Sequence, residues 1–164
     1  MKTIRRCLAL GLASITGFGV LALSPVAAQA AVDPLHDGLS EATAAASCWE
    51  IKQNNPRSSD GTYWLQTATM DAPGQFFCDQ TTDGGGWVMI GRGREGWETW
   101  SQGNGDQTRL QTRPRTPGDF EVVQASHETV NGLLGGTKVS DLPDGVMVQR
   151  AWNHRGSAYQ TVRM

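Results

Sequence analysis

Short runs of alternating apolar and polar residues, separated by Gly, Pro and Asp turns, fill the chain from residue 47 onward. Runs of this kind, bounded by turn residues and rich in aromatic and β-branched side chains, predict β-strands. The expected strands are 62–66, 74–79, 86–92, 145–152 and 158–164. We therefore expect a small antiparallel sheet unit.

A helical pattern stands out at "SHETVNGLLGG", residues 126–136. Ser126 can cap the helix, Val130 and Leu133 fall on one apolar face, and the glycines that follow end it. Residues 93–119 are rich in Gly, Arg and Thr and predict a long irregular excursion. The predicted class is α+β, with one short helix and long irregular loops.

The amino terminus has the three regions of a secretory signal peptide. Lys2, Arg5 and Arg6 precede an uncharged apolar run over 8–23, and "AQA" at 28–30 is a small-x-small cleavage site. The alternative is an uncleaved anchor, but the apolar run is shorter than the ~20 residues that a membrane span needs. We predict that residues 1–30 are removed and that the chain is secreted to the extracellular side, with a signal of bacterial character.

Residues 31–46 are small and polar, with little to bury, and are expected to form a short linker with a helical turn through 39–46. The domain is expected to span 47–164. Loss of the signal peptide removes three basic residues and lowers the formal net charge from −2 to −5. This acidic balance argues against nucleic acid and against anionic membrane surfaces as partners, since both select basic patches. No later segment is apolar enough to span a membrane.

Two cysteines remain after the signal peptide, Cys48 and Cys78. An even pair in an exported chain predicts one disulfide, which closes a loop of about 30 residues and stabilises the fold by roughly 3–4 kcal/mol. Two free thiols or a metal pair are the alternatives, although no His lies at ligand spacing from either cysteine.

The segment from Cys48 to Arg94 carries a specific order of motifs: Ser-Cys, Asp-Gly-x-Tyr, aromatic-Cys-Asp, Thr-Asp-Gly-Gly-Gly-Trp, and a strand ending in Arg-x-Arg. This order resembles the start of the fibrinogen C-terminal globular domain, the fold also found in ficolins and tenascins, and is similar to shortened bacterial exported versions. The residues that carry the resemblance are Cys48, Glu50, Ile51, Asp60, Gly61, Tyr63, Phe77, Cys78, Asp79, Thr82, Asp83, Gly84, Gly85, Gly86, Trp87, Ile90 and Arg92.

The resemblance thins after residue 95 and covers about the first half of such a domain. It implies a secreted recognition role, but it supplies no site, because the family's calcium site and ligand pocket lie in the part that has no counterpart here. The final run, 158–164, alternates like a strand and then the chain ends. An edge strand or a truncated piece would explain this, and we expect truncation.

The run from Asp79 to Trp87 is the most suggestive candidate site. A phosphate loop needs a Lys and a helix after its glycines, whereas Trp87 and a β-type run follow here. Asp79 and Asp83 are too few for a calcium loop and are expected to hydrogen-bond local backbone instead. Gly84, Gly85 and Gly86 are expected to provide positive φ or close backbone approach, so Gly85→Val should be destabilising.

Tryptophans supply the remaining candidates. We expect the side chains of Trp49, Trp64 and Trp87 to lie in the core, near the disulfide. Trp97 and Trp100, in "EGWETW", either fold back onto the sheet or stack on a sugar or a partner surface.

Charged side chains give no catalytic pattern. The arginines of the excursion, Arg109, Arg113 and Arg115, are expected to be solvated, and His36, His127 and His154 have no nucleophile at catalytic spacing. We predict no enzyme activity, no cofactor and no metal.

The sequence thus predicts an exported, non-catalytic recognition or adhesion module that binds a surface glycan or a protein. The alternative is a structural segment of a larger exported protein with no binding of its own. The oligomeric state and the ligand stay open.

Overall fold

The computed structural model describes residues 36–93, 105–113, 121–151 and 158–164. The predicted signal peptide, Trp97, Trp100, Arg115 and His154 lie outside these ranges. The strands are β1 (Gly61–Leu65), β2 (Gly74–Asp79), β3 (Trp87–Val88), β4 (Gly91–Arg92), β5 (Val123–Gln124), β6 (Met147–Ala151) and β7 (Tyr159–Arg163). The α-helices are α1 (Cys48–Asn54) and α2 (His127–Leu134), and the 3₁₀ turns are η1 (Glu41–Thr43), η2 (Thr82–Gly84), η3 (Thr108–Gln111) and η5 (Val139–Asp141).

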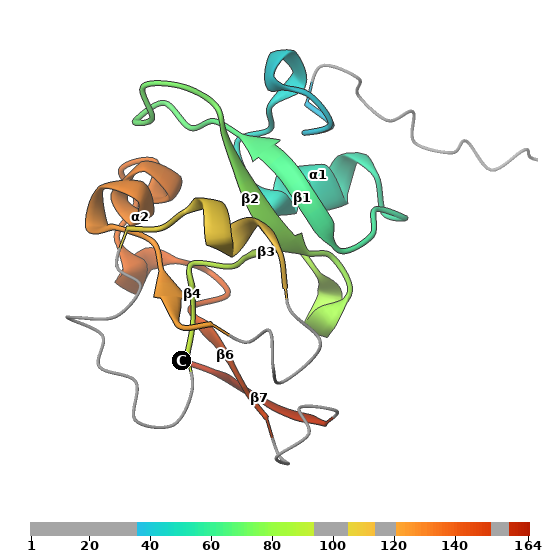
Figure 1. The fold of residues 1–164 in the computed structure, drawn as a ribbon. Helices are drawn as coiled ribbons and strands as arrows, with labels where there is room; N and C mark the ends of the chain where they lie inside the picture. The colour runs from blue at the N-terminus through green and yellow to red at the C-terminus, as the bar shows by residue number, and fades with distance from the viewer. Residues whose placement is uncertain (1–35, 94–104, 114–120, 152–157) are drawn as a thin grey trace, which may run out of the picture.

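The predicted α+β class is confirmed. The described strands form three small antiparallel sheets, in the orders β1-β2-β3, β4-β5 and β6-β7. β1 and β2 pair along their whole length, from Gly61 opposite Cys78 to Leu65 opposite Gly74. Figure 1 shows α1 against the β1–β2 pair, α2 at a neighbouring side and the β6–β7 hairpin extending from one end of the molecule.

Helix α1 was not predicted. Its first turn is held by a reciprocal cap: the Ser47 hydroxyl accepts the Glu50 N–H at 3.0 Å, and the Glu50 carboxylate accepts the Ala46 N–H at 2.6 Å. This arrangement satisfies amide groups that have no partner within the helix. Cys48 and Ile51, three residues apart, both face the core.

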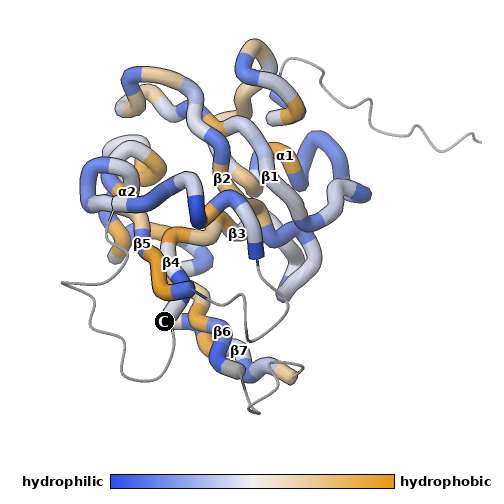
Figure 2. Tube along the Cα trace, in the orientation of Figure 1, coloured by the Kyte–Doolittle hydropathy of each residue, from blue (hydrophilic) through white to orange (hydrophobic). Residues whose placement is uncertain are grey.

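The core lies between α1 and the β1–β2 pair. Its buried members are Ala45, Cys48, Ile51, Tyr63, Leu65, Phe76 and Cys78. Leu110 and Val123 are buried as well, so part of the expected irregular excursion contributes a packed side chain. Figure 2 shows hydrophobic stretches beside β4 and β5, where Met89 and Ile90 precede β4 and Val123 begins β5.

The segment before α1 differs from the expected linker over its described part, residues 36–46. Ala45 is fully buried and forms a parallel bridge with Leu65. Its N–H donates to Trp64 O at 3.0 Å, and Trp64 N–H donates to Gly38 O at 2.7 Å. Backbone pairing, which the small and polar composition does not reveal, makes this segment an extension of the sheet.

The expected strand over 86–92 is two strands in two sheets. Met89 N–H donates to Phe77 O in β2, whereas Ile90 O accepts the N–H of Ala125 beside β5. The chain therefore leaves one sheet and enters the next between Met89 and Ile90.

Helix α2 begins and ends as predicted. The Ser126 hydroxyl accepts the Thr129 N–H at 3.2 Å, and Gly135 ends the helix in the left-handed conformation, with φ of 58°. The Thr69 hydroxyl donates to Gly132 O at 2.9 Å and so ties α2 to the loop between β1 and β2. Within the described ranges, no helix has the length and hydropathy that crossing a membrane requires.

Candidate functional site

The predicted Cys48–Cys78 disulfide is confirmed, and its Cα atoms lie 5.5 Å apart. Cys48 begins α1 and Cys78 lies near the end of β2, so the bond ties the helix to the central strand of the first sheet. Residues 79–87, which follow Cys78 directly, are called the Asp79–Trp87 turn below. The candidates Asp79, Asp83, Gly84, Gly85, Gly86 and Trp87 all lie in this turn.

Two carboxylates hold the first half of the Asp79–Trp87 turn. Asp79 Oδ1 accepts the N–H groups of Thr81 at 3.1 Å and Thr82 at 2.8 Å, and Asp60 Oδ1 accepts the Gln80 N–H at 2.8 Å. Burial by itself would raise the pKa of Asp79. Hydrogen bonds from Thr82 and Thr81, together with the charge of Arg113, more than offset burial and hold that pKa below its usual value.

Gln80 is a buried connector that the sequence analysis missed. Its side chain is fully shielded from solvent, its amide NH₂ donates to Cys48 O at 3.1 Å, and its amide oxygen accepts the Gly86 N–H at 3.2 Å. One amide side chain thus joins the start of α1 to the glycine run. The sequence around Gln80 contains no pattern that predicts the burial of this side chain or its contact with Cys48 O.

The three glycines all have positive φ: 92° at Gly84, 78° at Gly85 and 85° at Gly86. A Cβ on Gly85 would lie 2.2 Å from Gln80 O, and one on Gly86 would lie 2.6 Å from the Trp49 ring, whereas Gly84 faces open space. The N–H groups of Gly85 and Gly86 donate to Thr82 O and to the Gln80 side chain. These two donors are therefore used inside the turn and do not point at a phosphate.

The Asp83 side chain was expected to hydrogen-bond backbone groups of the turn, but its carboxylate binds Arg163 instead. Asp83 adopts a φ of 50°, and its carboxylate accepts a hydrogen bond from Arg163 Nε in β7. Arg163 also donates to Asp83 O at 2.9 Å and lies over the Trp87 ring, 5.0 Å from its centroid. The Trp87 indole N–H donates to Thr82 O at 3.1 Å, which fixes the ring that the guanidinium covers.

Arg113 makes a second link between the turn and the hairpin, so the expectation of a solvated side chain was wrong for this arginine. Its guanidinium lies 3.1 Å from Asp79 Oδ2, with the Asp79 side chain 8% and the Arg113 side chain 28% exposed. It also donates to the Gln149 side chain of β6 and lies over the Tyr159 ring of β7, 5.3 Å from the centroid. Two arginines thus connect the hairpin to the turn, each bound to an aspartate and stacked on an aromatic ring.

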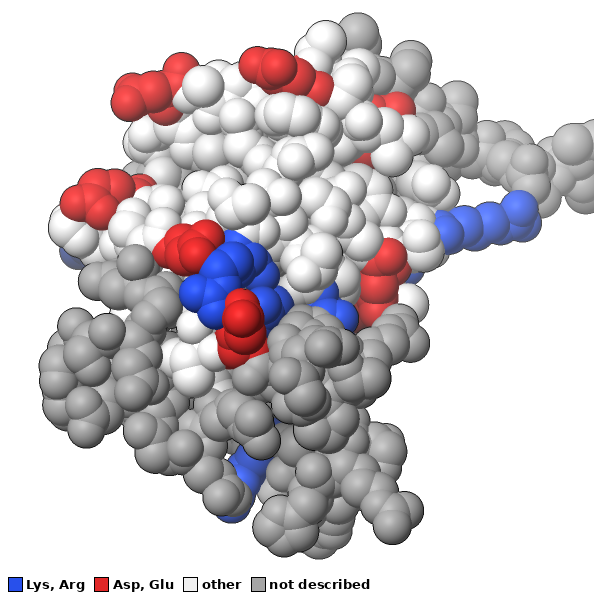
Figure 3. All heavy atoms as spheres, viewed as in Figure 1, with Lys and Arg blue, Asp and Glu red and all other residues white. Residues whose placement is uncertain are grey.

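Arg109 remains on the surface, where it pairs with Glu121 and lies 3.5 Å from Asp106. Interaction with Glu121 raises the pKa of this guanidinium above its usual value. On the face drawn in Figure 3, the central cluster of basic atoms has acidic atoms on both sides, and other basic atoms lie apart from it. The charges of the central cluster therefore compensate each other locally.

The described tryptophans are less buried than expected. Trp49 is 49% exposed, although the edge of its ring lies against Gly86, and Trp64 and Trp87 are partly exposed. The expectation of a core position was wrong for Trp49, because the helix α1 turns it outward while Cys48 and Ile51 face the core.

The described histidines lie apart from the turn. His36 Nδ1 is 3.4 Å from Ala44 O and 4.0 Å from the Glu50 carboxylate, and His127 pairs with Glu128 on the surface. Within the part of the chain that the structure describes, no three His, Cys, Asp or Glu side chains gather as metal ligands would. The polar side chains of Asp79, Gln80 and Asp83 in the Asp79–Trp87 turn are used in contacts that hold elements together.

Comparison with known proteins gives a partial similarity to a curated protein. No protein-family model matches the chain, and no solved structure matches it. Over 69 residues the chain is 36% identical to angiopoietin-4 of Mus musculus. The aligned region covers 38% of this chain and 13% of angiopoietin-4. Angiopoietin-4 has a fibrinogen-like C-terminal domain, so the similarity agrees with the resemblance while spanning a small part of the relative.

Proposed function

We propose that the chain is an exported, non-catalytic recognition module of the fibrinogen-like kind, which binds a cell-surface glycan or protein. The similarity to angiopoietin-4 is the single observation that carries this proposal. The Cys48–Cys78 disulfide supports it, because disulfides persist outside the reducing cytosol. The bacterial character of the signal and the match to the first half of the domain remain predictions within the proposal.

The structure favours a binding surface outside the Asp79–Trp87 turn. The side chains of Asp79, Gln80 and Asp83 all bind groups of the same chain, so a ligand there would have to break existing contacts. Trp97 and Trp100 remain the proposed contact residues, because an exposed indole offers a flat apolar face to a sugar ring or a partner. They lie outside the described residues.

A binding assay tests this proposal: the purified chain is applied to a glycan array and, separately, to solubilised cell-surface proteins. We expect a saturable ligand that is lost when Trp97 and Trp100 are both replaced by alanine. Leu39→Ala serves as the matched control, because Leu39 is a well-exposed apolar side chain in another region of the chain. Binding that survives the double substitution would remove the two tryptophans from the proposal, and the absence of any ligand would contradict the recognition function.

A structural role without binding is the second candidate, and the internal satisfaction of the turn favours it. The Asp79–Trp87 turn, which carries most of the family resemblance, binds α1 and the hairpin through the side chains of Gln80, Asp79 and Asp83. A folded, disulfide-bonded chain with no ligand in both screens would support this role over recognition.

A further inference from the structure

Among the residues that the structure describes, no strand pairs with the outer edge of β7, and this edge has the hydrogen-bonding phase needed to pair with another strand. Val146 and Met164 exchange two backbone hydrogen bonds of 3.0 Å each, and β6 and β7 pair in continuous register from Met147 opposite Arg163. In an antiparallel ladder, such pairs alternate with pairs whose N–H and C=O groups point outward. The groups of Tyr159, Thr161 and Arg163 therefore point away from β6.

All five residues of β7 are exposed, whereas Met147 and Gln149 of β6 are partly covered. Within the described ranges, the β6–β7 pair has no third strand. A two-stranded hairpin is marginal alone, and a third strand adds stability. The open edge is thus the place where this small sheet would gain most from another strand.

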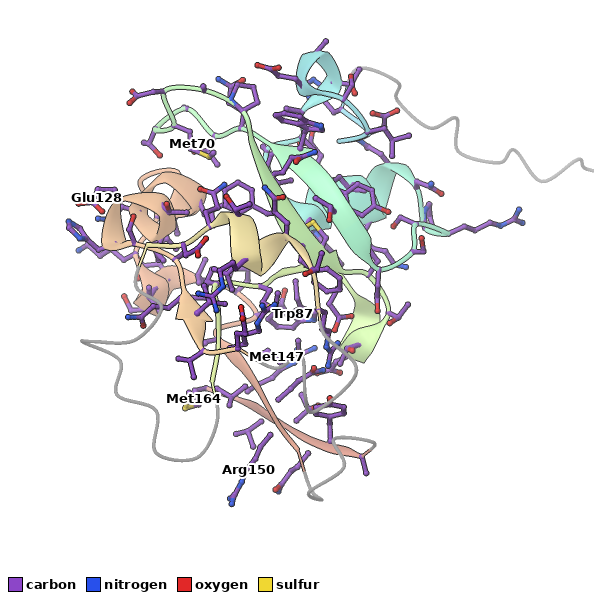
Figure 4. The ribbon with its side chains drawn as sticks, in the orientation of Figure 1. Met70, Trp87, Glu128, Met147, Arg150 and Met164 are labelled. Carbon is purple, nitrogen blue, oxygen red and sulfur yellow. A yellow bond between two sulfur atoms is a disulfide. The ribbon has the colours of Figure 1, made fainter. Side chains whose placement is uncertain are left out.

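The sequence of β7 carries few of the features by which proteins prevent edge-to-edge pairing. Residues 159–163 contain no Pro, no Gly, no Lys and no acidic residue. Their one charge, Arg163, is compensated by Asp83 and lies 3.5 Å from Asp144. The face of the hairpin opposite to the Arg163 side chain carries exposed Val148 and Val162 side chains directly across from each other. Figure 4 shows Arg150 pointing away from the body of the molecule.

We propose that β7 pairs with β7 of a second copy of this chain, antiparallel about a two-fold axis at Thr161, to form a four-stranded intermolecular sheet. The sequence of β7 is self-complementary in this register. Thr161 meets Thr161 of the partner, and Tyr159 lies opposite Arg163 of the partner at both flanks. Thr–Thr pairs and arginine–aromatic neighbours are favourable across strands. The same arginine–tyrosine chemistry already occurs within one chain, between Arg113 and Tyr159.

This register allows a sharp pair of substitutions. Thr161→Lys places two lysines directly opposite each other at the axis, whereas Gln160→Lys adds the same charge one residue away, opposite Val162 of the partner. Like charges directly opposite destabilise a sheet. Thr161→Pro removes the outward N–H without removing a hydrogen bond to β6, because Thr161 and Gln149 form a pair whose backbone groups point outward.

Sedimentation of the purified full chain, in the form that its host produces, over a wide concentration range tests the proposal. We expect the mass to rise from one chain to two, Thr161→Lys to weaken the dimer about fivefold or more, Thr161→Pro to abolish it, and Gln160→Lys to leave it nearly unchanged. Amide exchange of the wild-type chain gives a readout that needs no variant: the amides of residues 159, 161 and 163 should become protected as concentration rises.

A chain that stays monomeric at every concentration, with a rapidly exchanging Thr161 amide, would overturn the proposal. So would a dimer that tolerates both substitutions at Thr161. A monomer whose Thr161 amide is nevertheless protected would show that a segment of the same chain occupies the edge, which also overturns self-pairing. Failure here leaves the proposed recognition function untouched, since that function is tested on Trp97 and Trp100.

Discussion

Replacement of Gly85 by alanine tests whether the glycine run is a close-packed part of the fold. Gly85 has φ of 78° and ψ of −174°, a region that essentially only glycine occupies. Forcing a side chain into such a region costs of order 1–3 kcal/mol. The added Cβ would also lie 2.2 Å from Gln80 O, a backbone atom that cannot rotate away.

Relief of that contact requires movement of the Gln80 backbone, whose side chain binds Cys48 O and the Gly86 N–H. Loss of such hydrogen bonds costs about 0.5–1.5 kcal/mol each. The total expected loss of unfolding free energy is therefore about 2–6 kcal/mol, which is large for a single substitution. Gly85→Val should cost more still, because its branched side chain needs more room.

The matched control is Gly84→Ala. Gly84 also has positive φ, at 92°, but a Cβ there would meet no atom within 4 Å, so only backbone strain of about 1–2 kcal/mol is expected. Urea unfolding of the oxidised proteins, followed by tryptophan fluorescence, measures both variants. Equal losses for the two variants, or a loss below about 1 kcal/mol at Gly85, would show that the run is a slack loop and would refute the reasoning.

Further predictions concern the polar groups of the same turn. Asp79→Asn should cost about 2 kcal/mol at neutral pH, because Arg113 and the turn amides lose a charged acceptor, and a urea midpoint equal to that of the wild type would contradict this. The pKa of Asp79 is lower in the folded than in the unfolded state, so its ionised carboxylate stabilises the fold above the unfolded pKa of about 3.9, and this stability is lost as pH falls through the folded pKa. The free energy of unfolding should therefore depend less on pH below about pH 4 in Asp79→Asn than in the wild type. Gln80→Leu should cost about 1–3 kcal/mol by removing the hydrogen bond to Cys48 O and leaving the Gly86 N–H without its partner, and thermal unfolding at the wild-type midpoint would count against a connecting role.

The sequence predicted those parts of the fold that depend on local pattern. The strand at 74–79 and the helix after Ser126 were found because alternation and capping are local signals. Helix α1 was also within reach, since Ser47 followed three residues later by Glu50 is the sequence pattern of a helix amino terminus, and the Ser47 hydroxyl does accept the Glu50 N–H.

The contacts of the Asp79–Trp87 turn with the hairpin could not be predicted in the same way. Arg113 is 34 residues from Asp79, and Arg163 is 80 residues from Asp83, so no spacing rule joins them. The burial of Gln80 likewise depends on where α1 places Cys48 O. Polar contacts between distant segments follow from the tertiary arrangement, whereas the need for glycine at position 85 was legible from the motif itself.

The central claim is that the Asp79–Trp87 turn holds the fold together and is not a ligand cradle. Thermal unfolding of the oxidised chain in millimolar calcium and, separately, in inorganic phosphate, against sodium chloride of matched ionic strength, tests this claim most directly. Because Asp79 and Asp83 are already bound by arginines and the Gly85 and Gly86 amides are used internally, we expect no shift in the midpoint with either ion. A specific ligand at a hundredfold excess over its Kd would add about 2.7 kcal/mol of stability. A rise in the unfolding midpoint that corresponds to such a gain in stability would contradict the account if the rise disappears in Asp83→Asn for calcium, or in Gly84→Ala for phosphate.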